Sequence, residues 1–194
     1  MPPTEEDLPQ EVPFIDVRTE APVPNVRLFV GPIPMVAIDE GDMPRSLWIA
    51  VALDLVDGRA AGLGLYDAPP SDECVLSLLD QGTVGHGPLG TLWSCTCAAV
   101  TTDWALLWST PERLAWLTRR GIRLHAAVPA GPAADEVAQR AFGRTTASLC
   151  KFMKRRRHAR AADRRALLTL QAAAEAAREW RDACDVAEAG VPAG

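Results

Sequence analysis

The chain has 194 residues, 48% of them hydrophobic, which suits one domain with an appendage or loose ends. It carries 20 Lys and Arg against 25 Asp and Glu, so its formal net charge is −5. No apolar run approaches the roughly 18 residues that span a bilayer, and the first residues lack the basic and apolar regions of a secretory signal. We therefore expect a protein that is made in the cytosol, is not secreted and does not contact membranes.

Two features of the composition set the expected context. Residues 1–25 hold six prolines and six carboxylates, a composition that predicts an extended or disordered tail. The odd number of cysteines favours reduced thiols inside the cell, most of them buried as small apolar groups. These cysteines are Cys74, Cys95, Cys97, Cys150 and Cys184.

From residue 26 the pattern predicts short strands. Residues 26–30 and 33–38 flank Gly31-Pro32, and residues 47–56 form a nearly continuous apolar strand. Asp57-Gly58 predicts a type I′ turn into a partner strand at 61–66.

The next segment mixes short helices and strands. Ser71 and its neighbours are typical of an N-cap before a helix at 74–79, with Gly82 at its end. Residues 91–100 and 104–108 predict a second hairpin. Ser109 and Glu112 form a capping box for a helix at 111–120 that ends at Gly121, and residues 122–128 predict a last strand.

Beyond residue 130 the pattern is helical. Pro132 opens a helix, Gly143 interrupts it, and residues 145–188 contain neither Gly nor Pro. So long a helix must either bend or project from the body. The predicted fold is therefore α+β: a tail at 1–25, a core at 26–130 with a mainly antiparallel, or mixed, sheet of about six strands and short helices, and a C-terminal helical segment at 131–190.

A dense basic cluster is the most informative feature of the chain. Residues 144–165 contain nine Lys or Arg and one Asp, although the rest of the chain is acidic. The cluster is interpreted as a nuclear import signal, as a phosphate-binding site, or as a helix face that pairs with the acidic body. Import is preferred because only one aromatic residue, Phe152, lies in the cluster. The candidate residues are Lys151, Lys154, Arg155, Arg156, Arg157, Arg160, Arg164 and Arg165.

Other motifs point less clearly to chemistry. His86 with Cys95 and Cys97 could suggest a metal site, and Asp54 with Asp57 could hold a divalent ion, but each is better explained by burial or by a turn. No catalytic signature is recognised, and no catalytic residue, metal or cofactor is predicted. The chain has six tryptophans, and Trp180 is the one considered as an interface residue.

Part of the chain resembles small accessory proteins encoded in the unique-long region of alphaherpesviruses. The resemblance lies in residues 24–30, 43–45, 50–61, 65–66, 92–97 and 104–111. It implies a viral, tegument-type protein without enzymatic activity that acts in the host nucleus through contacts with other proteins. No functional residue is carried over from the family.

The favoured function is accordingly a nuclear accessory or adaptor protein with a basic import signal and a viral or import-receptor protein as partner. The first alternative is a nucleic-acid-binding module that uses residues 144–165. The second is a small metal-dependent hydrolase built on His86, Asp54 and Asp57. The sequence leaves the oligomeric state open.

Overall fold

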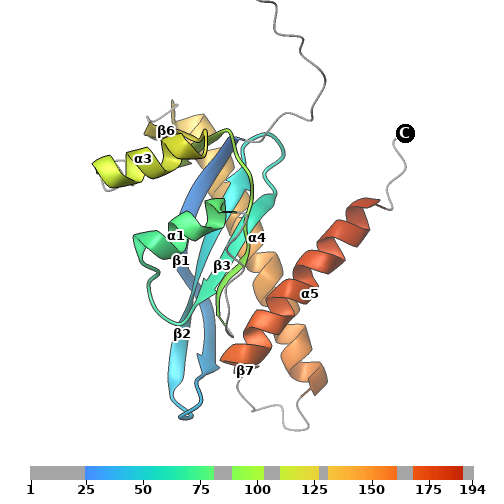
Figure 1. Cartoon of the computed structure of the whole chain (residues 1–194). Coiled ribbons are helices and arrows are strands. Elements are labelled where there is room, and N and C mark those ends of the chain that lie inside the picture. The colour runs from blue at the N-terminus through green and yellow to red at the C-terminus, as the bar shows by residue number, and fades with distance from the viewer. Residues whose placement is uncertain (1–24, 81–88, 103–109, 127–130, 161–167, 190–194) are drawn as a thin grey trace, which may run out of the picture.

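The computed structural model describes residues 25–80, 89–102, 110–126, 131–160 and 168–189, and these form an α+β fold around a single sheet (Figure 1). The sheet order is β4-β3-β2-β1-β5-β6, and β7 pairs with β1. Most paired residues are antiparallel, and the described residues form a sheet of seven strands, which agrees with the prediction of a mainly antiparallel sheet of about six. The strands are β1 (Asn25–Ile38), β2 (Pro44–Asp54), β3 (Ala60–Tyr66), β4 (Gly90–Trp93), β5 (Ala99–Thr102), β6 (Arg123–Ala126) and β7 (Leu168–Thr169).

Helices cover both faces of this sheet. One face packs against α4 (Gly131–Arg160) and α5 (Leu170–Ala189). The opposite face packs against α1 (Asp72–Leu76), the 3₁₀ helix η1 (Ser77–Leu79) and α3 (Pro111–Arg119). Each face therefore has its own hydrophobic core, as layered packing requires.

The antiparallel part differs from the prediction in two places. β1 continues through Gly31-Pro32 as one strand. Its pairing with β2 changes register between Pro32 and Val36, and such an irregularity allows a proline inside a strand. The connection between β2 and β3 is not a two-residue type I′ turn. Gly58 has a φ of 72°, but Asp57 does not share it, and the Asp54 N–H donates to the Arg59 carbonyl at 2.8 Å across a longer loop.

The predicted strand at 91–100 is divided between distant parts of the sheet. β4 pairs with β3, whereas β5 pairs in parallel with β1 and with β6. Between them, the Cys95 N–H donates to the Leu78 carbonyl at 2.8 Å, so the chain leaves the strand here instead of extending it. The predicted partner strand at 104–108 lies outside the described residues.

The start of α3 was predicted at the observed residue, whereas α1 begins two residues before the predicted helix at 74–79. Ser71 caps α1 by accepting from the Cys74 N–H at 3.3 Å, as predicted. The cap of α3 is Thr110 rather than Ser109: its Oγ1 accepts from the Arg113 N–H at 3.4 Å, which leaves Pro111 in the first turn. Gly121, with a φ of 68°, follows α3 as expected.

α4 is continuous through Gly143, contrary to the prediction. Phe142, on the buried side of the same turn, stacks on Phe29 of β1 with ring centroids 5.1 Å apart. Burial of a phenylalanine side chain is worth about 1.5–3 kcal/mol, which outweighs the cost of about 1 kcal/mol for a glycine in a helix. Of the two alternatives for the long helical segment, a bend near the basic cluster or a projection from the body, the first is closer: α4 ends at Arg160, and α5 is a separate helix that packs across α4 (Figure 1).

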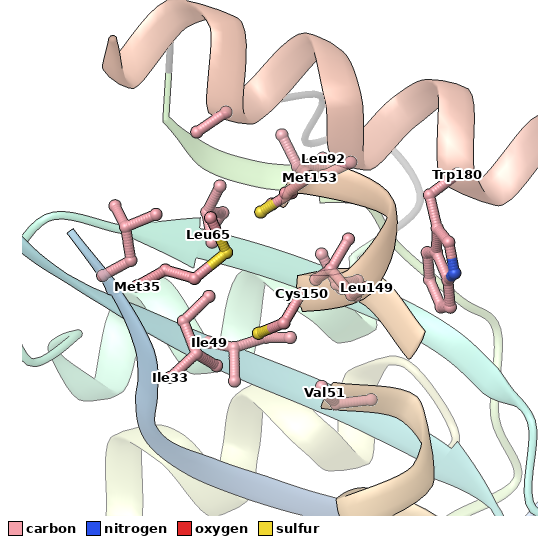
Figure 2. Close-up of a cluster of buried hydrophobic side chains, with 14 of the residues drawn as sticks. Ile33, Met35, Ile49, Val51, Leu65, Leu92, Leu149, Cys150, Met153 and Trp180 are labelled. Atoms are coloured by element: carbon pink, nitrogen blue, oxygen red, sulfur yellow. The ribbon is translucent and has the colours of Figure 1, made fainter. Parts of the chain in front are cut away.

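The core under α4 and α5 includes residues from both sides of position 130. Figure 2 shows Leu149, Cys150 and Met153 of α4 facing side chains of the sheet, among them Ile49. Leu149 and Met153 have no exposed surface. The helical segment therefore shares its core with the strands. In the part of the chain that the structure describes, no helix is long and apolar enough to cross a membrane.

Candidate binding surface on helix α4 and the adjoining pocket

The helix divides the basic cluster into an outward and an inward set. Lys151, Lys154 and Arg155 are exposed, whereas Arg156 and Arg157 are partly buried beside the core residues of α4. Arg160 is the last residue of α4, and Arg164 and Arg165 lie outside the described residues. A run of cations that is continuous in sequence is thus only partly accessible on the folded chain.

The outward set continues a longer row along α4. Arg144, Lys151 and Arg155 are spaced by seven and four residues, which places them on one side of a helix with 3.6 residues per turn. Eleven residues at 1.5 Å each give the row a length of roughly 16 Å. We call Arg144, Lys151, Lys154 and Arg155 the basic row. Among the described residues, no ion pair joins Lys151, Lys154 or Arg155 to a carboxylate.

The inward set is held by the protein itself. The Nε of Arg156 lies 2.6 Å from the Glu179 carboxylate of α5, and its guanidinium lies 5.8 Å from the Phe152 ring centroid. The Nε of Arg157 is buried without a hydrogen-bond partner. The interpretation of the cluster as a self-paired helix face therefore applies to Arg156 and not to the basic row.

A pocket adjoins the N-terminal end of the basic row. It has a volume of about 520 Å³ and lies between the β2–β3 connection, β4, α4 and α5. Its walls bring together three features that the sequence analysis considered separately: the pair Asp54 and Asp57, Arg144 of the basic cluster, and Trp180. The lining is completed by Gly58, Arg59, Ala60, Ala61, Trp93, Thr145, Ser148, Arg181 and Cys184.

Two tryptophans and an arginine build one wall of this pocket. The rings of Trp93 and Trp180 lie 6.3 Å apart and are tilted by 33°, and the Trp180 Nε1 donates to Ser148 Oγ at 3.1 Å. The Arg181 guanidinium lies 5.0 Å from the Trp93 ring centroid. Trp180 is only 7% exposed, so its ring is engaged inside the chain rather than presented as an exposed anchor. Trp93 and Arg181 were not recognised from the sequence, because they belong to different elements.

The aspartates of the pocket are accounted for by the turn. Asp54 Oδ1 accepts from the Val56 N–H at 2.7 Å, and Asp57 Oδ1 accepts from the Arg59 N–H at 2.8 Å. Asp57 also pairs with the Arg59 guanidinium at 3.3 Å. Within the described ranges, no group of three or more His, Cys, Asp or Glu could hold a metal ion, and His86 lies outside them.

Cys95 and Cys97 form a buried thiol pair. Both lie in the core under α1 and α3, on the coil between β4 and β5 rather than on a strand. A hydrogen bond between the two thiols, together with burial, raises the pKa of Cys97, and the same bond lowers the pKa of Cys95. Two sulfurs without further ligands here act as apolar packing groups.

A second pocket, of about 770 Å³, lies where the β1–β2 turn meets the start of α5. Its aspartate, Asp39, accepts from the N–H groups of Gly41 and Met43 and from the Arg45 guanidinium, each at 2.9 Å. The hydrogen bond from Met43, followed by the one from Arg45, lowers the pKa of Asp39. These contacts close the turn and leave this carboxylate little capacity for a ligand.

Comparisons with known proteins do not identify a family. No protein-family model and no curated protein matches the chain. One similar solved structure is the cryo-electron microscopy structure of the simian T-cell lymphotropic virus intasome in complex with PP2A regulatory subunit B56 gamma. One chain of that complex matches with a TM-score of 0.47 and 15% identity. The match covers 80% of this protein and 47% of the chain in the complex, so this protein spans about half the length of that chain.

Another similar structure is the catalytic core domain of BIV integrase, with a TM-score of 0.46 and 14% identity over 79% of each chain. Both structures contain viral proteins, and neither is from an alphaherpesvirus, so the resemblance found in the sequence stays a prediction. At this level of similarity neither structure carries an inference about activity.

Proposed function

We propose that this protein is a non-enzymatic adaptor of viral type that acts in the nucleus through contacts with an acidic protein partner. The observation that supports it is the basic row: cations on one side of a helix, exposed, and without a carboxylate partner among the described residues for Lys151, Lys154 and Arg155. A surface of this kind steers an acidic partner and sets its orientation. The rest of the chain is acidic, which keeps such a partner from binding elsewhere.

Nuclear delivery belongs to the same proposal. An acidic import receptor can pair with Lys151, Lys154 and Arg155 while α4 stays folded, since all three are exposed. Arg156 can take part only if it leaves Glu179. The exposed cations therefore contribute most of the expected import signal.

The test uses the full chain fused to a fluorescent reporter in animal cells. The double substitution Lys151→Ala with Arg155→Ala is expected to move the fusion from the nucleus to an even distribution. The control, Arg119→Ala with Arg123→Ala, removes the same charge from two exposed positions outside the cluster and should stay nuclear. An even distribution of the unmodified fusion, or equal behaviour of the two variants, contradicts the proposal.

A second candidate function is binding to single-stranded nucleic acid. It is favoured by the basic row, because Arg144, Lys151 and Arg155 lie on one side of α4 and can contact successive phosphates. Trp93 and Trp180 are 6% and 7% exposed, so neither ring is open to a stacked base, and import remains the preferred function. Titration of the full chain with labelled single strands at several salt concentrations tests it. The double substitution Lys151→Ala with Arg155→Ala removes two phosphate contacts, so the affinity of this variant should depend less on salt concentration. Absence of binding at low salt excludes this function.

A further inference from the structure

We propose that residues 1–24, here called the acidic segment, bind to the basic row of their own chain and compete there with other anions. The basic row is the surface on which the proposed function rests, but binding of the acidic segment requires neither nuclear delivery nor an acidic protein partner. Three features support it: the charges of the two parts, the point where the acidic segment joins the sheet, and the length of the segment.

The acidic segment and the basic row carry opposite charges. Residues 1–24 contain six carboxylates and one arginine, so their side chains contribute five net negative charges. The basic row contributes four positive charges, and among the described residues no ion pair joins Lys151, Lys154 or Arg155 to a carboxylate. Such exposed charges attract over a distance of about 10 Å at 0.1 M salt. The six carboxylates belong to Glu5, Glu6, Asp7, Glu11, Asp16 and Glu20.

The acidic segment joins the sheet near the N-terminal end of the basic row. It is followed by Asn25, the first residue of β1, whose carbonyl accepts from the Leu55 N–H of the β2–β3 connection at 2.8 Å. Gly58 of the same connection lies against α4, since a Cβ on Gly58 would be 3.4 Å from Cβ of Ala141. Arg144, three residues further along α4, lines the pocket that adjoins this connection. The acidic segment therefore starts its path close to the first cation of the row.

The acidic segment is long enough to reach every cation of the row. Five residues separate Glu20 from Asn25, and they span up to about 17 Å at 3.3 Å each, which brings Glu20 within reach of Arg144. Nine further residues lead back to Glu11 and span up to about 30 Å, whereas the row is roughly 16 Å long. Asp16 and Glu11 can therefore meet the cations at the C-terminal end of the row.

The covalent connection favours the acidic segment over a free anion. Single ion pairs between exposed groups are weak, so a separate peptide of this composition needs a high concentration to occupy the row. A short tether instead holds the acidic segment at an effective concentration in the millimolar range. The same effect favours the segment of the same chain over that of a second copy.

The test is cross-linking of the full chain with a carbodiimide, which joins a lysine amine directly to a carboxylate in contact with it. The chain has two lysines, Lys151 and Lys154, and both belong to the basic row. Mass spectrometry of the cross-linked monomer is expected to find these lysines joined to carboxylates of the acidic segment, with a yield that falls as salt concentration rises. Absence of such cross-links overturns the proposal. So do cross-links that join the segment only to a second copy in a mixture of isotope-labelled and unlabelled protein.

A charge-matched comparison tests the competition with other anions. The triple substitution Glu11→Gln, Asp16→Asn and Glu20→Gln should bind a labelled polyglutamate peptide about threefold more tightly than a control triple variant. A threefold gain corresponds to a row that is covered about two thirds of the time. Equal affinities of the two variants mean that net charge alone sets the affinity, and they overturn the competition. The control makes the same change of net charge at three exposed positions outside the acidic segment: Asp42→Asn, Asp67→Asn and Asp182→Asn.

A conservative variant locates the contact on α4. Lys151→Arg with Lys154→Arg keeps both charges and removes both amines, so cross-links to the acidic segment should disappear while the affinity for polyglutamate stays within about twofold. Cross-links that persist in this variant do not come from the basic row and overturn the assignment. These experiments use purified protein, so a failure of nuclear localisation leaves their outcome unchanged.

Discussion

Arg156 of α4 lies 2.6 Å from Glu179 of α5, and this contact divides the basic cluster into a structural and an accessible part. Both side chains are partly exposed, at 43% and 34%, so the ion pair contributes little to stability but fixes where one cation points. The neighbouring Arg155 faces solvent instead.

Glu179→Gln is predicted to release Arg156 to the surface. Stability should fall by less than about 1 kcal/mol, as for other exposed ion pairs, whereas elution from a heparin column should shift to higher salt. The control Asp182→Asn makes the same change of net charge at an exposed position of α5. An equal shift in both variants would mean that net charge alone, and not the position of Arg156, sets the affinity.

Leu149→Ala tests whether α4 and the sheet form one core. Leu149 is fully buried beneath α4, so its truncation should lower the free energy of unfolding by about 2–5 kcal/mol in urea denaturation of the whole chain. Val137→Ala on the same helix, where the side chain is 60% exposed, should change it by less than about 0.5 kcal/mol. A separate unfolding transition for the helical segment would contradict the shared core.

Two glycines are predicted to respond oppositely to alanine. A Cβ on Gly64 would lie 2.6 Å from Cζ of Tyr66, whose ring covers that position, so Gly64→Ala should destabilise the protein by about 1–3 kcal/mol. A Cβ on Gly143 meets nothing within 4 Å, and Gly143→Ala should stabilise α4 by about 0.5–1 kcal/mol. Urea denaturation of both variants measures these changes, and a loss of stability in Gly143→Ala would be inconsistent with this geometry.

Tyr66 predicts a loss of stability at alkaline pH. Burial raises the pKa of Tyr66 above that of an exposed phenol. As the pH rises, the phenol therefore ionises in the unfolded chain before it ionises in the folded protein. The contribution of the neutral, buried phenol to the free energy of unfolding is present below about pH 10 and is lost as the pH rises toward the pKa of Tyr66 in the folded protein.

Tyr66→Phe removes this dependence. At neutral pH it should cost about 0.5–1.5 kcal/mol, because the hydroxyl donates to the Cys74 carbonyl at 3.1 Å. Above about pH 10 the difference from the unmodified protein should shrink, as judged by urea denaturation at each pH. Because Tyr66 is the chain's one tyrosine, ultraviolet absorbance of the phenolate reports its titration directly. A normal phenol titration in the folded protein would refute the burial effect.

Local patterns determined much of the secondary structure. Secondary structure was predictable where it depends on the backbone or on nearest neighbours, because the sequence shows such effects directly. Examples are the cap at Ser71, the helix end at Gly121 and the apolar strand that ends at Asp54. The mainly antiparallel α+β sheet follows from the same signals.

Long-range packing decided the rest. Gly143 remains helical because Phe142 is held by Phe29, and residues 91–100 divide into two strands because their partners are β3 and β1. The sequence shows the cations of the basic cluster. It does not show which of them are exposed, because that depends on which side of α4 the sheet and α5 cover. The pocket joins Trp93, Arg144 and Arg181 from three elements, and burial of apolar surface between those elements, which no local pattern records, brings them together.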